Sequence, residues 1–273
     1  MLELKGKVAI VTGAGRRVGI GRHAALELAR LGADVVVTGT NRSPDTFPKS
    51  EVEIDWKGPE SVADEIRDLG RRSLALTLDV TNNDQVENVV ASTVQEFGRI
   101  DILVNNAAFP VGKDRLPMLE VEEDVFQNVV DVKVTGLFLM SRAVVREMIR
   151  FGRGGKIVNV SSQAGKRGVP NSLAYNAASF AIVGMTQSMA SELGPNKINV
   201  NAVCPGFVWT TRAGELDDPD RILNAAEWAK KTPIRRNGSP DEVGAFIASL
   251  CTEATSWITG QSINLNGGTV MEH

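Results

Sequence analysis

Fold class follows from one stretch of the sequence, Thr12-Gly13-Ala14-Gly15-Arg16-Arg17-Val18-Gly19-Ile20-Gly21, which joins a strand-like run to a helical pattern. The run before it is Val8–Thr12, and the helical pattern after it is Gly21–Leu31. Glycines at such a junction permit a tight turn and a close approach of the backbone to a diphosphate. The free N–H groups and positive dipole of the next helix then face that diphosphate. The stretch therefore predicts a dinucleotide-binding α/β protein.

Strand-like and helical segments alternate along the rest of the chain. Several strand-like runs are apolar throughout, as expected for parallel strands covered on both faces. We expect strands at Val8–Thr12, Val35–Thr38, Leu74–Leu78, Ile102–Asn105, Ile157–Val160, Asn199–Val203 and Ser262–Leu265. We expect helices at Gly21–Leu31, Val62–Leu69, Asp84–Phe97, Val125–Ile149, Leu173–Leu193 and Asp241–Leu250. Right-handed crossovers would join them into a doubly wound sheet. The expected fold is one Rossmann-type domain over residues 1–273, with a mostly parallel seven-stranded sheet and helices on both faces.

Composition excludes several classes of function. The net charge of -3 provides no basic stripe for nucleic acid and no polybasic patch for a membrane surface. Cys204 and Cys251 are the only cysteines, which is typical of a reducing compartment. With His23 and His273 as the only histidines, there is no metal-binding cluster of the usual spacing. No apolar run is long enough to span a bilayer, and the amino terminus leaves no room for a signal peptide. We expect a cytoplasmic protein with a small-molecule substrate and no metal.

Two long segments interrupt the alternation of strands and helices. The segment Asn41–Gly58 is predicted to be an excursion on the surface. The segment 207–233 follows the sixth strand, so it is predicted to be a lid over the ligand cleft. Phe109, Trp209 and Trp228 lie in loops beyond the strand ends, where they form either an apolar substrate wall or the packing of the lid.

Further motifs give the chain a resemblance to the short-chain dehydrogenase/reductase family. The glycine stretch resembles the family's motif, with two extra residues before Gly19. The resemblance continues in Leu78-Asp79-Val80, Asn105-Asn106-Ala107-Ala108, Ile157-Val158-Asn159-Val160-Ser161-Ser162, Asn201-Ala202-Val203-Cys204-Pro205-Gly206 and Ile258-Thr259-Gly260-Gln261. It implies an oxidoreductase similar to 3-oxoacyl-carrier-protein reductases, acting on a carbonyl or a secondary alcohol. It also implies a homotetramer built through Val125–Ile149 and Leu173–Leu193.

The resemblance also assigns a cofactor site. Its expected residues are Gly13, Arg16, Arg17, Gly19, Ile20, Thr40, Asn41, Arg42, Asp79, Val80, Asn106, Ala107, Ala108, Tyr175, Pro205, Gly206, Val208 and Thr210. An acid at the end of the second strand would bind the ribose hydroxyls of NAD and repel a 2′-phosphate, but this chain has Gly39 there. Arg42, with Arg16 or Arg17, would pair with a phosphate, so we favour NADP over NAD. The alternative is that these arginines are only solvated.

The expected catalytic residues depart from the family's pattern at two positions. Ser162 and Tyr175 match, and the resemblance implies that Ser162 binds the substrate oxygen while Tyr175 exchanges a proton with it. Ser179 stands where the family has a lysine four residues after the tyrosine, and Lys133 stands where the family has an asparagine. In the family the lysine binds ribose and lowers the tyrosine pKa. A cation has therefore moved from one helix to its neighbour.

The electrostatic free energy of one nearby cation is large enough for Lys133 to replace the charge of the missing lysine. Lowering a tyrosine pKa from ~10 to ~7 takes about 4 kcal/mol. One cation at roughly 4 Å in an effective dielectric of about 20 supplies a similar amount. Ser179 would keep a hydrogen bond to ribose. The sequence then predicts NADP-dependent reduction of a carbonyl, or oxidation of the alcohol, in a small apolar substrate. The alternative is that Lys133 points into solvent or an interface, in a non-catalytic dinucleotide-binding sensor or partner subunit.

Overall fold

Seven strands form one sheet in the computed structural model, which describes residues 2–42 and 46–272. The strand order is β3-β2-β1-β4-β5-β6-β7, and every pairing is parallel. The strands are β1 Val8–Val11, β2 Asp34–Gly39, β3 Ser73–Thr77, β4 Ile102–Asn105, β5 Gly155–Val160, β6 Ile198–Pro205 and β7 Ser262–Leu265. The predicted doubly wound fold is confirmed, and its sheet is parallel throughout.

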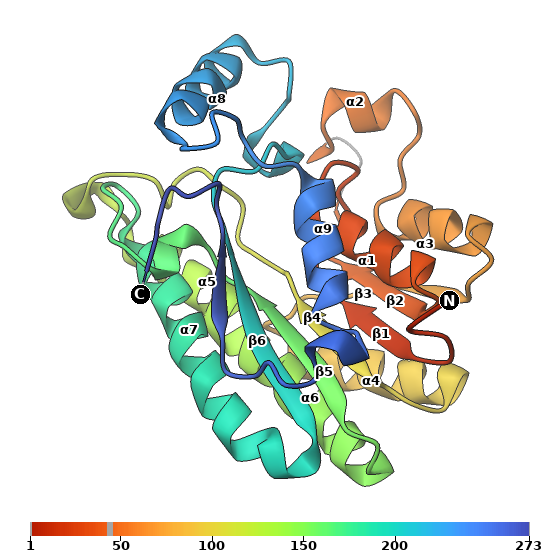
Figure 1. Ribbon diagram of the computed structural model, residues 1–273. Coiled ribbons are helices and arrows are strands. Elements are labelled where there is room, and N and C mark those ends of the chain that lie inside the picture. Colours follow the sequence, from red (N-terminus) through yellow and green to blue (C-terminus); the bar gives the residue numbers. More distant parts are fainter. Residues whose placement is uncertain (1, 43–45, 273) are drawn as a thin grey trace.

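Helices cover both faces of the sheet (Figure 1). Successive strand residues point to opposite faces. Ala9 and Val11 of β1 accordingly pack into a core with α1, α3 and α9, whereas Ile10 packs into a second core with α4, α6 and α7. These helices are α1 Ile20–Arg30, α3 Pro59–Asp68, α4 Asn83–Phe97, α6 Gly136–Phe151, α7 Leu173–Leu193 and α9 Pro240–Ser249. In the part of the chain that is described, no helix is both long and apolar enough to cross a membrane.

The segment predicted as one helix over Val125–Ile149 is interrupted. Helix α5, Glu123–Val130, passes into a π turn at Asp131–Thr135, and α6 follows directly. A π turn carries one more residue than an α turn, and hydrophobic periodicity alone does not reveal it. Lys133 lies in this wider turn and is only 3% exposed.

The prediction of a surface excursion at Asn41–Gly58 holds only in part for the described residues, since Val52 to Asp55 are exposed whereas Glu51 and Gly58 are buried. Residues 46–58, which include the short helix α2 Lys49–Val52, pack against the glycine-rich loop. The indole N–H of Trp56 donates to the Gly15 carbonyl at 2.8 Å, and a Glu51 carboxylate oxygen accepts from the Arg17 backbone N–H at 2.9 Å. Residues 43–45 lie outside the described residues.

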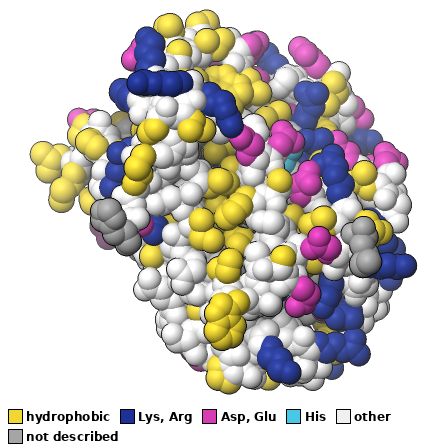
Figure 2. All heavy atoms as spheres, viewed as in Figure 1, with side chains coloured by type: hydrophobic (Ala, Val, Ile, Leu, Met, Phe, Trp, Pro, Cys, Tyr) yellow, Lys and Arg dark blue, Asp and Glu magenta, His cyan; other side chains and the backbone are white. Residues whose placement is uncertain are grey.

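The segment after β6 rises beyond the carboxyl ends of the strands. It contains a short 3-10 turn at Thr211–Ala213 and helix α8, Pro219–Lys231 (Figure 1). Between them, the Glu215 carboxylate accepts from the Lys49 backbone N–H at the start of α2. Asp218 caps α8 by accepting from the Arg221 backbone N–H at 3.0 Å. In the space-filling view this region forms a lobe that carries both basic and hydrophobic side chains (Figure 2).

The crossing of α1 and α9 depends on a glycine, which yields a test of the fold. A Cβ at Gly244 would lie 2.6 Å from the backbone carbon of His23. We expect Gly244→Ala to destabilise the protein by about 1–3 kcal/mol, since a tightly packed contact must open. Gly168 has no neighbour within 4 Å and no positive φ, so Gly168→Ala serves as the control. Urea unfolding would measure both, and equal stability of the two variants would contradict the packing argument.

Candidate active site

A cavity of about 460 Å³ opens at the carboxyl ends of the strands. It begins at the glycine-rich loop and the end of β2, and it reaches Tyr175 on α7. It lies where the strand order reverses between β1 and β4, the usual ligand position in such sheets. The predicted residues that line it are Gly13, Arg16, Gly19, Ile20, Thr40, Arg42, Asp79, Val80, Asn106, Ala107, Ala108, Lys133, Ser162, Tyr175, Pro205, Gly206, Val208 and Thr210.

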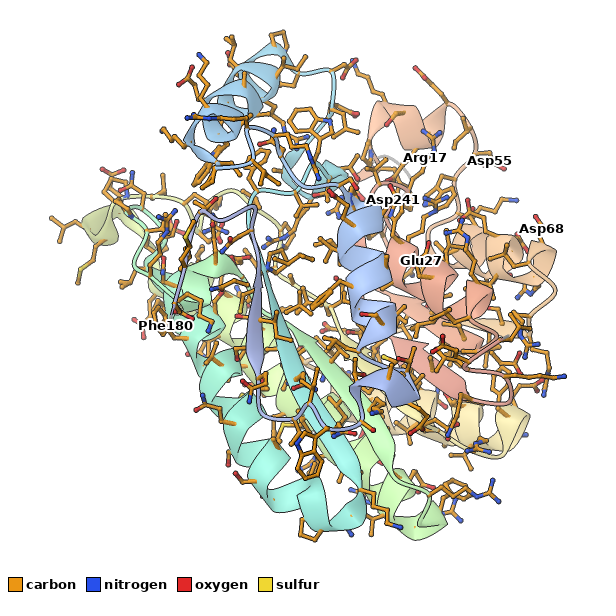
Figure 3. The ribbon with its side chains drawn as sticks, in the orientation of Figure 1. Arg17, Glu27, Asp55, Asp68, Phe180 and Asp241 are labelled. Atoms are coloured by element: carbon orange, nitrogen blue, oxygen red, sulfur yellow. The ribbon has the colours of Figure 1, made fainter. Side chains whose placement is uncertain are left out.

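Three predicted site residues lie outside the cavity lining. Arg17 is exposed on the glycine-rich loop beneath α2 (Figure 3), and Asn41 is also exposed. Ser179 is fully buried, its carbonyl accepts from the Ser161 hydroxyl at 2.9 Å, and its own hydroxyl has no hydrogen-bond partner among the described residues. Contacts of these three side chains with a cofactor therefore stay predictions.

The glycine-rich loop is pressed against the chain that follows β4. Gly13 has φ +66°, and a Cβ on it would lie 2.8 Å from the Ala107 Cα. The Asn106 amide donates to the carbonyls of Thr12 and Gly13, each at 2.9 Å. These contacts leave the start of α1 facing the cavity with N–H groups that the helix itself does not use. A diphosphate fits this cradle.

Two arginine side chains lie close to the carboxyl end of β2. Arg16 and Arg42 both line the cavity, and the Arg42 guanidinium lies 4.7 Å from the centre of the Phe47 ring. Burial, together with Arg42, lowers the pKa of Arg16 to about 10. Glu51 is fully buried under the glycine-rich loop, and burial raises its pKa. With Gly39 in place of an acid, this end of the cavity suits a phosphate.

The hydroxyl group of Ser162 is positioned so that its proton can be donated in a hydrogen bond. Ser162 lies two residues beyond the end of β5, and its hydroxyl oxygen accepts from the Ala164 backbone N–H at 3.1 Å. The hydroxyl proton is not used in that bond. Asn176 fixes the distance between this loop and α7, because its amide donates to the carbonyls of Ala164 at 2.8 Å and Arg167 at 2.7 Å.

Tyr175, in the first turn of α7, lies among three cations. The Arg115 guanidinium is 3.8 Å, the Lys133 ammonium 4.8 Å and the Arg212 guanidinium 5.2 Å from the centre of its ring. Burial raises the pKa of Tyr175, but Lys133 and Arg212 outweigh it. The Ser162 hydroxyl and Arg115 stabilise the phenolate further, and the pKa settles at about 7.

Lys133 therefore points into the site and not into solvent. Burial lowers its pKa, while the nearby phenolate opposes that decrease. The buried position follows from the π turn that carries it. Whether this ammonium does the work of the missing lysine stays a prediction, although its position is the one that such a role requires.

Sequence reasoning missed two of the three cations. Arg115 lies in the irregular segment after β4, and Arg212 lies two residues beyond Thr210, with its guanidinium donating to the Phe109 carbonyl at 2.7 Å. No local pattern marks either residue. Of the aromatic residues considered for a substrate wall, Phe109 lines the cavity, whereas Trp228 stacks on Phe207 at 5.9 Å within the segment 207–233. Over the described residues, no three His, Cys, Asp or Glu side chains are grouped to hold a metal.

Comparison with known proteins places these features in a family. Residues 13–270 match the family model described as enoyl-(acyl carrier protein) reductase. The chain is 37% identical over 272 residues to a 3-oxoacyl-[acyl-carrier-protein] reductase of Synechocystis sp., covering 99% of this chain and 100% of the relative. The chain belongs to the short-chain dehydrogenase/reductase family.

Other members of the short-chain dehydrogenase/reductase family support this assignment. A 3-oxoacyl-[acyl-carrier-protein] reductase of Vibrio cholerae is 35% identical over 270 residues, covering 99% of this chain and 100% of the relative. A solved structure of a putative short-chain alcohol dehydrogenase from Sinorhizobium meliloti superposes with a TM-score of 0.84 at 30% identity, covering 98% of each chain. The family resemblance found in the sequence is thereby confirmed.

Tyr175 is the only tyrosine in the chain, so its ionisation can be read directly. We expect tyrosinate absorption in the ultraviolet to appear with a midpoint near the pKa of about 7. In Lys133→Met the midpoint should move toward the ordinary value of about 10, because a buried cation beside the phenolate is lost. The variant Tyr175→Phe contains no tyrosine and therefore gives the background absorbance to be subtracted. A wild-type midpoint already near the ordinary value would show that the cations do not act on this phenol.

Proposed function

We propose that this member of the family is an NADP-dependent oxidoreductase that reduces a carbonyl group. The observation that carries the proposal is a single phenol, Tyr175, with a pKa of about 7, placed beside Ser162 at the end of a glycine-lined cavity. A group that exchanges a proton near neutral pH suits general acid–base catalysis. Members of the short-chain dehydrogenase/reductase family are oxidoreductases, so the proposed activity is of the kind that the family carries out.

The proposed reaction divides into a proton transfer by the protein and a hydride transfer by the cofactor. NADPH, held by the glycine-rich loop and the arginines at the end of β2, would supply the hydride that the carbonyl carbon receives and would be oxidised in doing so. Ser162 donates a hydrogen bond to the carbonyl oxygen and holds it beside Tyr175. Tyr175 gives its hydroxyl proton to that oxygen, so the C=O bond becomes C–OH. Lys133, Arg115 and Arg212 stabilise the phenolate that remains.

The choice of NADP over NAD rests on the end of β2. Arg16 and Arg42 converge there, and a carboxylate that would repel a 2′-phosphate is missing at position 39. A guanidinium binds phosphate through two parallel charge-assisted hydrogen bonds. NAD lacks that phosphate and would leave the two arginines repelling each other.

The substrate is proposed to be a small carbonyl compound with an apolar part. Phe109, Pro110 and Val208 give the cavity an apolar wall near Tyr175. Several relatives are named 3-oxoacyl-[acyl-carrier-protein] reductases, so a 3-oxoacyl thioester is one compound to assay. The segment 207–233 would act as the lid of a single domain, and the setting would be the cytoplasm.

A non-catalytic sensor or partner subunit is the weaker alternative. It would leave Lys133 without a function, although this ammonium is buried against the one phenol in the cavity. Burying a charge is costly, so a side chain without a role there would be expected to turn to solvent.

Assembly into a homotetramer is part of the proposal. The α6 and α7 helices expose large apolar side chains that the monomer leaves uncovered, namely Phe138, Ile149, Leu173 and Phe180. Phe180 projects outward from α7 (Figure 3). A second copy of the chain would bury these side chains.

The cofactor assignment can be tested by titrating NADPH and NADH with fluorescence detection. We expect NADPH to bind at least tenfold more tightly, equivalent to about 1.4 kcal/mol. Arg42→Ala should remove most of this preference, whereas Arg17→Ala, which changes a side chain outside the cavity, should preserve it. A Gly39→Asp variant is less suitable, because its Cβ would lie 2.9 Å from the Pro59 ring. Equal affinities in the wild type would overturn the assignment to NADP.

The role of Lys133 can be tested by turnover in both directions. Lys133→Met should lower alcohol oxidation by about 10²-fold or more, because oxidation needs the phenolate and the variant raises the Tyr175 pKa. Ketone reduction uses the neutral phenol, so it should fall less. The pH at which oxidation becomes fast should also rise from the wild-type value near 7.

The matched variants for this test rebuild the family's pattern. Ser179→Lys alone would place a second ammonium near the first, where each lowers the pKa of the other. The double variant Lys133→Asn with Ser179→Lys should recover activity that each single variant loses, which would show that the two positions act together. An unchanged oxidation rate in Lys133→Met would contradict the proposed role. If no variant oxidises NADPH with any carbonyl, the non-catalytic alternative is correct.

A further inference from the structure

The cations around Tyr175 are more numerous than their counter-ions. Lys133 comes from the π turn before α6, Arg115 from the segment after β4, and Arg212 from the segment after β6. Within the described residues, the only carboxylate paired with any of them is Asp114, whose oxygen lies 3.4 Å from the Arg115 Nε. Three cations thus face one carboxylate.

Of the three cations, Lys133 is buried, whereas the Arg115 side chain is 26% exposed and Arg212 is half-buried. Lys133 is 3% exposed, and its ammonium has no hydrogen bond to any residue in the described ranges. Arg212 uses its guanidinium on the Phe109 carbonyl, which is neutral. Asp114 is fully buried, and it is a permanent counter-charge for one of the three cations. Buried charges without partners are costly, and the site gains free energy from an added anion.

The charge excess is largest in the state that reduction needs. An ionised Tyr175 would offset a second cation, but a phenolate has no proton to give. With the phenol neutral, two positive charges remain uncompensated. An anionic group on the substrate would offset one of them and would favour the protonated phenol at the same time.

We propose that the natural substrates are oxo acids, in which a carboxylate adjacent to the carbonyl, or one carbon from it, is bound by Arg115 and Arg212. The proposal rests on the carbonyl reductase activity and narrows its substrate class. The planar guanidinium matches a carboxylate through two parallel hydrogen bonds. The short spacing follows from the site, because both guanidiniums lie within 5.2 Å of the Tyr175 ring whose hydroxyl must reach the carbonyl oxygen. The apolar wall at Phe109 would contact the rest of the molecule.

Paired substrates give the first test. Each oxo acid is compared with its methyl ester, which keeps the carbonyl and loses the charge. We expect kcat/KM for the acids to exceed that for the esters by about tenfold or more, the worth of one charge-assisted hydrogen bond. Arg212→Gln and Arg115→Met should raise KM for the acids and remove the preference. Lys113→Met, a change of an exposed cation in the same loop as Arg115, should keep it.

Binding without turnover gives the second test. Malonate carries two carboxylates but has no ketone to reduce, and malonamide is its neutral counterpart with two amides. Malonate should raise the midpoint of the Tyr175 absorbance titration in the wild type but not in Arg115→Met, and malonamide should have no effect. Sodium chloride at matched ionic strength is the control for screening.

The outcomes separate this inference from the reductase activity. Reduction of esters or 3-oxoacyl thioesters as fast as oxo acids, with no response to malonate, would overturn the oxo-acid assignment and leave the reductase activity standing. A malonate-dependent midpoint without reduction of any carbonyl would support the anion site and overturn the reductase activity.

Discussion

The cavity depends on hydrogen bonds that join the ends of β1 and β4. The Thr12 hydroxyl accepts from the backbone N–H groups of Asn106 and Ala107, each at 3.0 Å, and the Asn106 amide returns two bonds to Thr12 and Gly13. These strands are neighbours, but the chain leaves them toward opposite edges of the sheet. A crevice must open between the departing connections. The hydrogen bonds fix its floor, and the small size of Gly13 lets the two loops meet there.

A second set of buried polar groups holds the catalytic side of the cavity in place. The Asn105 amide donates to Asn159 at 2.9 Å, and the Asn159 amide donates to the Thr186 hydroxyl at 2.9 Å. This chain of bonds links β4, β5 and the middle of α7. Fully paired buried networks are rigid. Rigidity matters here because a pKa near neutrality results from burial opposed by nearby charges, and both change steeply with distance.

Local patterns predicted the sheet and the glycine-rich loop, and the family resemblance supplied most of the residues that line the cavity. Strands such as Ile102–Asn105 are recognisable because burial on both faces leaves a continuous apolar run. The π turn around Lys133 was not predictable, since the helical periodicity continues on both sides of it. Arg115 and Arg212 were missed because their meeting at Tyr175 is a property of the folded chain. Burial of Ser179 also depends on distant neighbours such as Gly165, where a Cβ would lie 2.6 Å from the Ser179 carbonyl oxygen.

The buried carboxylate of Glu51 connects the glycine-rich loop to the segment that follows β2. It accepts from the Arg17 N–H of the loop, and it lies within the segment 46–58. Each part supports the other: without the longer loop the carboxylate would lose the Arg17 N–H as a donor, and without Glu51 that N–H would lose its acceptor. Homologues that carry the two additional loop residues should therefore also carry an acid in this segment, so that the pair traces a single lineage within the family.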